Sequence, residues 1–320
     1  DSSFIIHLTV EDNELPVILS THQDTTLTGD ESGVTPLPDF TSGVMATDNC
    51  DTALDIAQTP VPGTMISGPL NTVTLTVIDN NENIAEVSFN VEVILLPELY
   101  VDLKVFLHGP FNGGGMSTYL NDNDYLPSEQ PYNTAPWNYG GSESTGSMPE
   151  NTVDWVYIEL RDAPDAASAT ATTIVNSQAA LLLSDGSVVD PTTLDNLRFN
   201  VNINSNLFVV VYHRNHLPVM SSGPLPANGD VYSWDFTDGA SKALGGEYSQ
   251  NEMEPGIWGM IPSNPDANQK VDNQDKNDHW VVDYNTTPGY LQSDFDFNAF
   301  VNLEDKDIWI SNAGKASQVP

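Results

Sequence analysis

The first hundred residues of this chain consist of short apolar runs, each of which ends in a turn. The runs are β-branched or alternate between apolar and polar residues, and they cover residues 4–10, 16–19, 73–78 and 87–94. Asp-Asn, Pro-Gly and Asn-Asn pairs separate them, and helical periodicity is absent. Because side chains of a strand alternate between two faces, such runs are typical of half-buried strands. The pattern predicts an antiparallel sandwich of immunoglobulin-like size.

A second β-rich region follows without an obvious flexible linker. Its predicted strands cover residues 101–107, 153–160, 179–183, 197–203, 207–212 and 231–236. A long stretch from residue 112 to residue 150 is dense in Gly, Ser, Asn, Pro and aromatic residues. Loops of this length are usually functional or packed. We expect Tyr132, Trp137 and Tyr139 to form a small core of the loop itself, and the alternative is that they stack on sugars.

The charge of the chain limits its partners. Only 9 Lys and Arg residues stand against 45 Asp and Glu residues, which gives a net charge of −36. Such a field repels phosphate backbones and anionic lipid headgroups and attracts cations, so we expect no nucleic-acid partner. No apolar run approaches the length of a membrane span, so we expect no membrane insertion. The length of 320 residues suggests two or three domains.

An internal repeat is visible near the start of the chain. Residues 3–10 (SFIIHLTV) are similar to residues 88–93 (SFNVEV), with a period of 85 residues. Residues 1–10 are therefore predicted to be the last strand of a preceding repeat. The chain begins with neither Met nor a leader sequence, so we expect it to be a processed or excised piece of a longer protein.

The segment 11–97 resembles the hyalin-repeat (HYR) family of immunoglobulin-like modules. The matching pieces are residues 14–18 (ELPVI), 46–50 (ATDNC), 72–79 (TVTLTVID) and 83–85 (NIA). The resemblance implies an extracellular spacer or adhesion module, often present in tandem. The family's second cysteine position holds Val87, so the lone Cys50 lacks its usual partner. We expect Cys50 to be a small buried hydrophobe that faces Val87 across the sandwich.

Two acidic loops thirty residues apart give the sharpest signal in the chain. Asn264-x-Asp266-x-Asn268 leads into Val271-Asp272-x-x-Asp275, and Asp294-x-Asp296-x-Asn298 leads into Val301-Asn302-x-x-Asp305. Each loop continues into a helix-like stretch, residues 273–282 with Trp280 and residues 303–311 with Trp309. We assign residues 259–320 to this loop pair and residues 98–258 to the β-rich domain.

The loops have the composition of a calcium site. Calcium takes six to eight oxygen ligands, which a twelve-residue loop supplies from side chains and one backbone carbonyl. The loops resemble dockerin-type duplicated loops, which implies that Ca²⁺ is bound by Asn264, Asp266, Asn268, the Lys270 carbonyl, Asp272 and Asp275 in the first loop, and by Asp294, Asp296, Asn298, the Phe300 carbonyl, Asn302 and Asp305 in the second.

Both loops depart from the family at one position. Gln269 and Ala299 stand where the family has a turn glycine, and a left-handed backbone costs a non-glycine residue about 1 kcal/mol. The first loop also begins with Asn264 instead of Asp and contains Lys270, so we expect it to bind more weakly. The alternative is that both loops are vestigial and fold without metal.

Residues 101–320 resemble a β-rich domain found near the C-termini of large secreted proteins of Bacteroidota. The matching pieces include residues 103–110 (LKVFLHGP), 154–156 (DWV), 159–161 (ELR), 213–217 (HRNHL) and 314–320 (GKASQVP). The resemblance implies an exported cell-surface or extracellular protein that is a substrate of type IX secretion. It implies no catalytic activity.

The motif His213-Arg214-Asn215-His216 has two readings. The two histidines could share one zinc ion if the chain turned between them, although no third ligand adjoins them at a fixed spacing. We favour a polar hydrogen-bonding corner in which Arg214 pairs with Asp154 or Glu159. The sequence contains no nucleophile elbow, no zinc-protease motif and no phosphate-binding glycine loop. We therefore expect that the chain is not an enzyme.

These features together predict a mainly β protein, with an immunoglobulin-like sandwich, a second β-rich domain and a small helical loop pair. The expected function is the non-catalytic C-terminal part of a large secreted adhesin or stalk, whose ligand is a protein, a glycan or another copy of itself. A subunit of an extracellular filament and a docking or secretion-targeting terminus are the alternatives.

Two segments, residues 24–26 (DTT) and 51–53 (DTA), resemble O-glycosylation acceptors of Bacteroidota.

Overall fold

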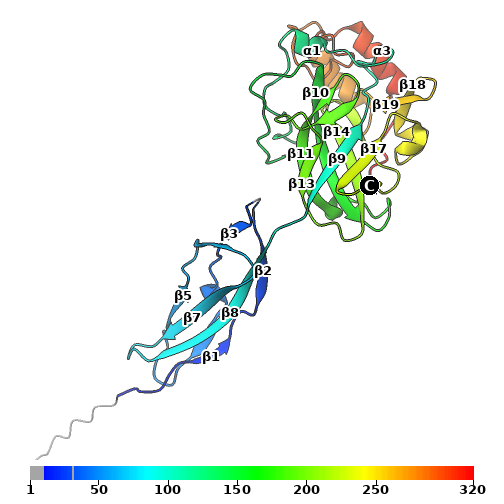
Figure 1. The fold of residues 1–320 in the computed structure, drawn as a ribbon. Coiled ribbons are helices and arrows are strands. Elements are labelled where there is room, and N and C mark those ends of the chain that lie inside the picture. The colour runs from blue at the N-terminus through cyan, green and yellow to red at the C-terminus, as the bar shows by residue number, and fades with distance from the viewer. Residues whose placement is uncertain (1–10, 31) are drawn as a thin grey trace, which may run out of the picture. The chain divides into compact units, whose positions relative to one another are not determined.

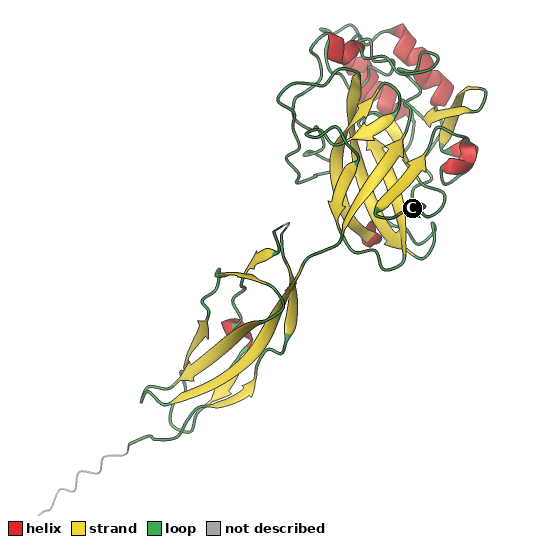
Figure 2. Cartoon of the chain, in the orientation of Figure 1, coloured by secondary structure: helices red, strands yellow, loops and turns green. Residues whose placement is uncertain are grey.

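The computed structural model describes residues 11–30 and 32–320, and the chain divides into two compact units, residues 1–97 and 98–320. Strands are the main regular structure of both units (Figures 1 and 2), which confirms the predicted fold class. The expected strand over residues 4–10 lies outside the described residues. Among the described residues, no helix is long and apolar enough to cross a membrane.

The first unit is built from one larger sheet and two small ones. Its four-stranded sheet has the order β2-β8-β7-β5, in which only the β2–β8 pair is parallel. The pairs β1–β4 and β3–β6 form the small antiparallel sheets. The strands are β1 (Val17–Ser20), β2 (Thr25–Thr28), β3 (Val34–Pro36), β4 (Met45–Thr47), β5 (Asp55–Thr59), β6 (Met65–Ser67), β7 (Asn71–Ile78) and β8 (Ile84–Ile94).

Strand β7 shows why this unit folds as its sequence predicts. Val73, Leu75 and Val77 on one face are fully buried. On the other face Thr74 meets Ser88 of β8 through their hydroxyl groups at 2.9 Å. One strand thus contributes an apolar face to the core and a polar face that is paired across strands, as the alternation in the sequence requires.

The expected pairing of Cys50 with Val87 is wrong. Val87 lies on β8, where it is half-buried against the core of the first unit. Cys50 lies in the turn after β4 and is exposed. The backbone N–H groups of Cys50 and Asp51 both donate to Asp48 Oδ1, at 2.9 and 3.0 Å. This side-chain-to-backbone turn holds Cys50 on the surface, so it is not a buried hydrophobe.

The second unit contains a nine-stranded sheet. Its order is β15-β14-β10-β11-β12-β9-β17-β16, and β13 pairs with β9 beside β12. All pairs are antiparallel except β9–β17. The strands are β9 (Glu98–Lys104), β10 (Thr152–Ala163), β11 (Ile174–Leu183), β12 (Ser187–Val189), β13 (Leu197–Asn200), β14 (Asn206–His213), β15 (His216–Met220), β16 (Ala227–Asn228) and β17 (Val231–Asp235).

The central strand β10 is buried on both faces. One face contributes Val156, Ile158 and Leu160 to the main core. Trp155 and Tyr157 on the other face contact the long loop, whose Tyr132 is fully buried and donates from its hydroxyl to the Trp155 carbonyl at 2.8 Å. The predicted core of the loop itself is thus shared with the sheet: Tyr132 is buried against strand residues, and Trp137 and Tyr139 are only partly buried beside it. The loop also contains the short helix α1 (Tyr119–Asp122).

The acidic loop pair is part of the second unit. It follows the hairpin of β18 (Gln250–Glu254) and β19 (Ile257–Met260). Its helical parts are η5 (Asp275–Trp280, a π-helix), α2 (Val281–Asp283) and α3 (Leu303–Asn312). Phe297 and Ala299 of the second loop are fully buried in the main core beneath the sheet. The structure therefore shows no domain boundary between residues 258 and 259.

We expect Phe297→Ala to destabilise the whole second unit. The ring is fully buried in the shared core, and removal of such a ring costs about 3–5 kcal/mol of unfolding free energy. Denaturant unfolding monitored by tryptophan fluorescence measures the loss. Phe300→Ala is the matched control, because Phe300 lies in the same loop and is 47% exposed. Equal effects of the two substitutions would contradict the shared core.

Candidate functional site: two acidic loops held by one polar turn

The second loop brings three carboxylates together. Carboxylate oxygens of Asp294, Asp296 and Asp305 all lie within 4.8 Å of one another. Asp294 and Asp305 are fully buried. Backbone N–H groups orient them: that of Ala299 donates to Asp294 Oδ2 at 2.8 Å, and that of Phe295 donates to Asp305 Oδ1 at 2.6 Å. The loop therefore fixes three oxygen donors around a common centre.

The first loop follows the same path. Asn264 and Asp275 are buried beside the half-buried Asp266. Within the described chain, Asn264 Oδ1 and Asp275 Oδ1 are buried and have no hydrogen-bond partner. A buried oxygen without a partner is costly, and a bound cation would satisfy both atoms. The residues present thus fit a hard cation, with one carboxylate fewer than in the second loop.

The missing turn glycines do not prevent the loop geometry. Gln269 and Ala299 adopt φ values of 68° and 70°, in the left-handed region that the family's glycine would occupy. Ala267 and Phe297, two residues earlier in each loop, also have positive φ values, 54° and 61°. The backbone conformation thus repeats after thirty residues. Each loop contains non-glycine residues in the left-handed region despite the free-energy cost of that conformation.

Other predicted ligands have structural partners. Asp272 Oδ1 accepts from the Gln274 N–H at 2.7 Å, and Asn302 Oδ1 accepts from the Glu304 N–H at 2.6 Å, so these two oxygens cap the following helices. The side-chain amide groups of Asn268 and Asn298 donate to the aspartate two residues earlier, at 2.8 and 2.9 Å. The Oδ1 atoms of Asn268 and Asn298 accept from the N–H groups of Lys270 and Phe300. That the carbonyls of Lys270 and Phe300 bind calcium stays a prediction.

Burial and mutual repulsion dominate the electrostatics of the loops. Burial raises the pKa of Asp294 to about 8, and the charges of Asp305 and Asp296 add to this effect although Arg214 opposes it. Burial likewise raises the pKa of Asp305 to about 7. The pKa of Asp275 in the first loop also rises to about 7, through burial and the nearby charge of Asp266. Without a cation, each loop is a place where negative charge is unfavourable.

The turn between β14 and β15 joins both loops to the sheet. The N–H groups of Ser263 and Asn264 donate to the Asn215 carbonyl, at 2.9 and 3.0 Å. The side-chain amide of Asn215 donates to the carbonyls of Gln292 and Asp294, at 3.0 and 2.9 Å. One asparagine thus holds the start of the first loop with its backbone and the start of the second loop with its side chain.

A buried ion pair supports this turn. Arg214 Nε donates to Asp154 Oδ2 at 2.8 Å, and both side chains are almost fully buried. His213 Nε2 lies 3.1 Å from the same oxygen, and the Tyr290 hydroxyl donates to Asp154 Oδ1 at 2.6 Å. Although burial opposes ionisation of Asp154, the charge of Arg214 lowers its pKa to about 2. The predicted polar corner, with Arg214 paired to Asp154, is confirmed.

The structure gives no support to a zinc site at this corner. His213 and His216 approach through their Nδ1 atoms at 3.1 Å, and His216 Nδ1 also lies 2.8 Å from Asn215 Oδ1. Neither histidine belongs to a group of three or more metal-ligating side chains in the described part of the chain. Both rings pack near the ring of Phe297 from the second loop.

The tryptophan of each helical segment forms a hydrogen bond to the other segment. Trp280 of the first segment donates from Nε1 to the carbonyl of Asn302, at 2.9 Å. Trp309 of the second segment donates from Nε1 to the carbonyl of Asp272, at 3.0 Å. Each indole thus bonds to the residue that precedes the other helix. The duplicated sequence therefore folds as a reciprocal pair.

The π-helix accounts for an offset of one residue in this reciprocal pair. Asp272 and Asn302 are thirty residues apart, whereas Trp280 and Trp309 are separated by twenty-nine. A π-turn accommodates one extra residue, and η5, which ends at Trp280, contains it.

Two lysines thirty residues apart also contact the tryptophans. The Lys276 ammonium group lies 5.2 Å from the ring centre of Trp309, and that of Lys306 lies 5.5 Å from the ring centre of Trp280.

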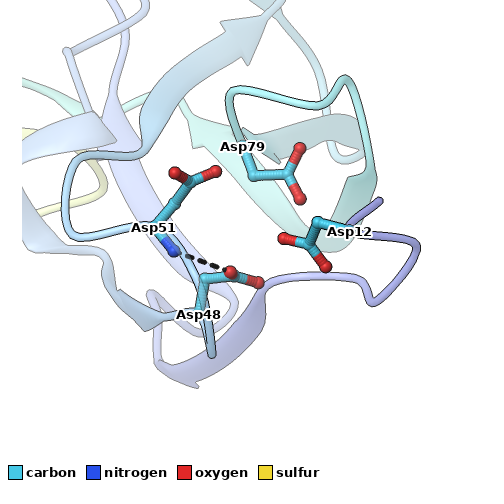
Figure 3. A group of neighbouring side chains, drawn as sticks. All are labelled: Asp12, Asp48, Asp51 and Asp79. Carbon is cyan, nitrogen blue, oxygen red and sulfur yellow. Dashed lines mark hydrogen bonds between the residues drawn. The ribbon is translucent and has the colours of Figure 1, made fainter. Parts of the chain in front are cut away.

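The first unit contains a second acidic group that the sequence did not reveal. Carboxylate oxygens of Asp12, Asp48, Asp51 and Asp79 lie within 4.8 Å of one another (Figure 3). They come from the segment before β1, the turn after β4 and the turn after β7. Asp12 Oδ2 and Asp48 Oδ2 are buried atoms without a hydrogen-bond partner in the described structure. No spacing signal could have found this group, because its members span 67 residues.

Comparison with known proteins finds only distant similarity. The sequence matches no family profile and no curated protein. A mutant type II cohesin–X-dockerin complex from Acetivibrio cellulolyticus is 10% identical, with 69% of this chain and 96% of that chain covered, at a TM-score of 0.31.

Two further structures are similar at a lower level. The CBM51-2 (in complex with GlcNAc) and INT domains of ZmpB from Clostridium perfringens are 13% identical, with 60% of this chain and 44% of that chain covered, at a TM-score of 0.17. Dimeric latent PorU from Porphyromonas gingivalis is 12% identical, with 72% and 21% covered, at a TM-score of 0.17. Similarity at TM-scores this low supports no inference about function.

We expect Asp154→Asn to destabilise the second unit by about 3–5 kcal/mol, because the substitution leaves the buried Arg214 guanidinium without its counter-charge. Chemical denaturation measures the change. The matched control is Glu98→Gln, which breaks the ion pair with Arg198 where both side chains are about 40% exposed. An exposed pair contributes about 0–1 kcal/mol, so a similar loss in both variants would contradict the role of the buried pair.

The raised pKa values of the loop aspartates predict an unusual pH dependence. Unfolded aspartate has a pKa of about 3.9, so without divalent cations these aspartates bind more protons in the folded protein than in the unfolded chain between about pH 4 and pH 8. Burial lowers the pKa of His213 and His216, so their contribution to stability rises with pH until histidines of the unfolded chain lose their protons near about pH 6.5. Stability in chelator should therefore fall as the pH rises from about pH 7 to pH 8, where the aspartates dominate. The Asp154 contribution is complete above about pH 4 and does not interfere.

Thermal melting in chelator across this window tests the dependence. Asp294→Asn should flatten the curve, because the amide does not titrate. Asp51→Asn, an equivalent change in the first unit, should leave the melting of the second unit unchanged. Stability of the second unit that increases with pH in chelator would contradict the prediction.

Proposed function

We propose that this chain is a non-catalytic, modular part of a large secreted cell-surface adhesin or stalk, whose second unit is stabilised by Ca²⁺ at the duplicated loops. The observation that carries the proposal is the convergence of three carboxylates, two of them fully buried, in the second loop. A carboxylate cluster in a core is unfavourable unless it is protonated or binds a cation.

The size of the repulsion supports a cation. Like charges about 4 Å apart repel by about 4 kcal/mol at an effective dielectric of about 20. Arg214 is the cationic side chain that lowers the pKa of Asp294, and it is already bonded to Asp154. Asp294, Asp296 and Asp305 would hold the ion in the second loop, and Asn264, Asp266 and Asp275 would hold it in the first. The ion would replace repulsion with attraction and so couple binding to folding.

Calcium is the cation that the donor set favours. The donors are carboxylate and amide oxygens, which suit a hard cation with variable geometry. Imidazole and thiolate ligands, which select zinc or copper, are absent from both loops. The first loop offers two carboxylates instead of three, so its affinity should be lower.

The role of spacer or adhesin is supported by the sequence. The HYR resemblance of residues 11–97 and the resemblance of residues 101–320 to secreted β-rich domains both imply export to the cell surface. The acidic surface suits an environment in which calcium is abundant. The buried histidines are engaged in the turn that holds the loops, which supports a structural role for them over a catalytic one.

Exposed apolar side chains favour docking to a partner protein as a second candidate function. Leu303 and Ile310 are 57% and 55% exposed and lie seven residues apart, on one face of α3. Val281 and Val282 of α2 are 54% and 65% exposed. Contiguous exposed apolar residues are typical of surfaces that bind another protein, and Leu303 and Ile310 share one face of α3. A filament subunit would use such a surface between copies.

Calcium should raise the melting temperature of the second unit and protect residues 259–320 from proteolysis. Because Asp305 belongs to the stronger loop, Asp305→Ala should remove much of the calcium-dependent increase, and Asp275→Ala should remove less. Asp305 also accepts the Asn302 N–H at the start of α3, so the readout is the difference between calcium and chelator within each variant.

Asp12→Asn is the matched control, because it removes one carboxylate from the acidic group of the first unit. It should leave the calcium protection of residues 259–320 intact. If calcium changes neither melting nor cleavage of the second unit, the loops are vestigial and the proposal is wrong.

A further inference from the structure

A pocket of about 190 Å³ lies on the face of the sheet that carries Tyr157 and Glu159 of β10. Trp137 of the long loop and residues of the first acidic loop also line it, including Asn264 and Gln269. The β14–β15 segment contributes Tyr212 and His216, so four segments that are far apart in the sequence line the pocket. At about 30 Å³ for each water molecule, its volume corresponds to about six waters. A single pyranose ring with its hydroxyl groups needs a space of this order.

The aromatic walls of the pocket are held in place. Tyr157 lies directly opposite Tyr212 in the β10–β14 register, and their ring centres are 5.7 Å apart. Trp137 packs edge-on against the buried Tyr132, with ring centres 5.0 Å apart. Because these rings are fixed by the sheet and by the core of the loop, the pocket is formed before a ligand arrives, which reduces the entropic cost of binding.

The polar groups of the pocket can accept and donate hydrogen bonds without a strong net charge. Glu159 Oε2 accepts from Arg161 at 2.8 Å and from the Tyr212 hydroxyl at 3.2 Å, so its charge is largely compensated. Burial lowers the pKa of His216 well below its usual range, so the ring is neutral. His216 Nε2 is buried and has no partner in the described structure, and its ring lines the pocket.

We propose that this pocket binds one neutral sugar residue of a glycan. Aromatic rings offer surfaces for the apolar face of a pyranose, and the carboxylate, imidazole and hydroxyl groups match its hydroxyls. No Lys or Arg lines the pocket, which disfavours an anionic ligand. A quaternary ammonium ion would need an uncompensated charge or an open aromatic cage, whereas Glu159 is paired with Arg161.

This inference goes beyond the calcium-stabilised spacer, although Asn264 of the first acidic loop belongs to both sites. The first acidic loop contributes one wall of the pocket, but the aromatic and acidic walls come from the long loop and the sheet. The pocket would give an adhesin its own sugar specificity. Loss of calcium stabilisation and loss of sugar binding are separate observations, so either can fail alone.

Binding is tested on the whole chain by ligand-observed NMR, with the methyl glycosides of glucose, galactose and N-acetylglucosamine as probes. We expect saturable binding of at least one glycoside to the protein in calcium. Trp137→Ala should weaken it at least about tenfold, since a central aromatic contact is the typical hot spot of a binding site. Tyr212→Phe, which removes the hydroxyl bonded to Glu159, should weaken it without unfolding the protein.

Two controls make the outcome decisive. Trp258→Phe and Tyr248→Phe change aromatic residues that do not line the pocket, and Tyr248 is 77% exposed. Both should bind as the unchanged protein does, and circular dichroism should show that all variants are folded. The proposal is overturned if no glycoside binds, if Trp137→Ala and Tyr212→Phe bind as tightly as the controls, or if choline binds in this pocket and the glycosides do not.

Discussion

The buried pair of Asp154 and Arg214 is the contact on which the second unit depends. Asp154 lies on the central strand and Arg214 lies in the turn after β14, so the pair fixes that turn against the sheet. The same turn then holds both acidic loops through Asn215. A buried charge needs a partner with good geometry, and Asp154 receives bonds from Arg214, His213 and Tyr290.

The duplicated loops form a pair that is more closely connected than two separate binding loops. Each tryptophan bonds to the carbonyl that precedes the other helix, and each lysine lies over the other segment's indole. A cation bound in one loop would therefore stabilise the helical segment that supports the other. The burial of Phe297 extends this connection into the main core. We expect the loops and the sheet to unfold together for this reason.

The pocket and the loops share one structural element. The first acidic loop begins at Asn264, which is bonded to Asn215 of the turn before β15, and its residues form one wall of the pocket. Order in that loop therefore contributes to the shape of the pocket. The proposed sugar site needs no moving part, because the aromatic walls of the pocket are already packed against β10 and the long loop.

The sequence by itself determined the features that depend on neighbouring residues. Alternation along residues 73–78 predicted a strand with one buried face, and the thirty-residue spacing predicted two equivalent acidic loops. The His-Arg-Asn-His motif predicted that Arg214 pairs with a carboxylate. Each of these signals is local, or repeats at a fixed interval, so it can be read without knowing the contacts. The resemblance to dockerin-type loops also located the positions that adopt positive φ, at Gln269 and Ala299.

Only the tertiary structure decided which distant residues meet. It placed Cys50 on the surface through a turn at Asp48, and it gathered Asp12 and Asp79 at one site although 67 residues separate them. It also made the loop pair part of the second unit, because Phe297 is buried in the main core together with side chains of the sheet. Burial, pKa shifts and pocket walls arise from long-range packing, and a single sequence carries no local signal for such contacts.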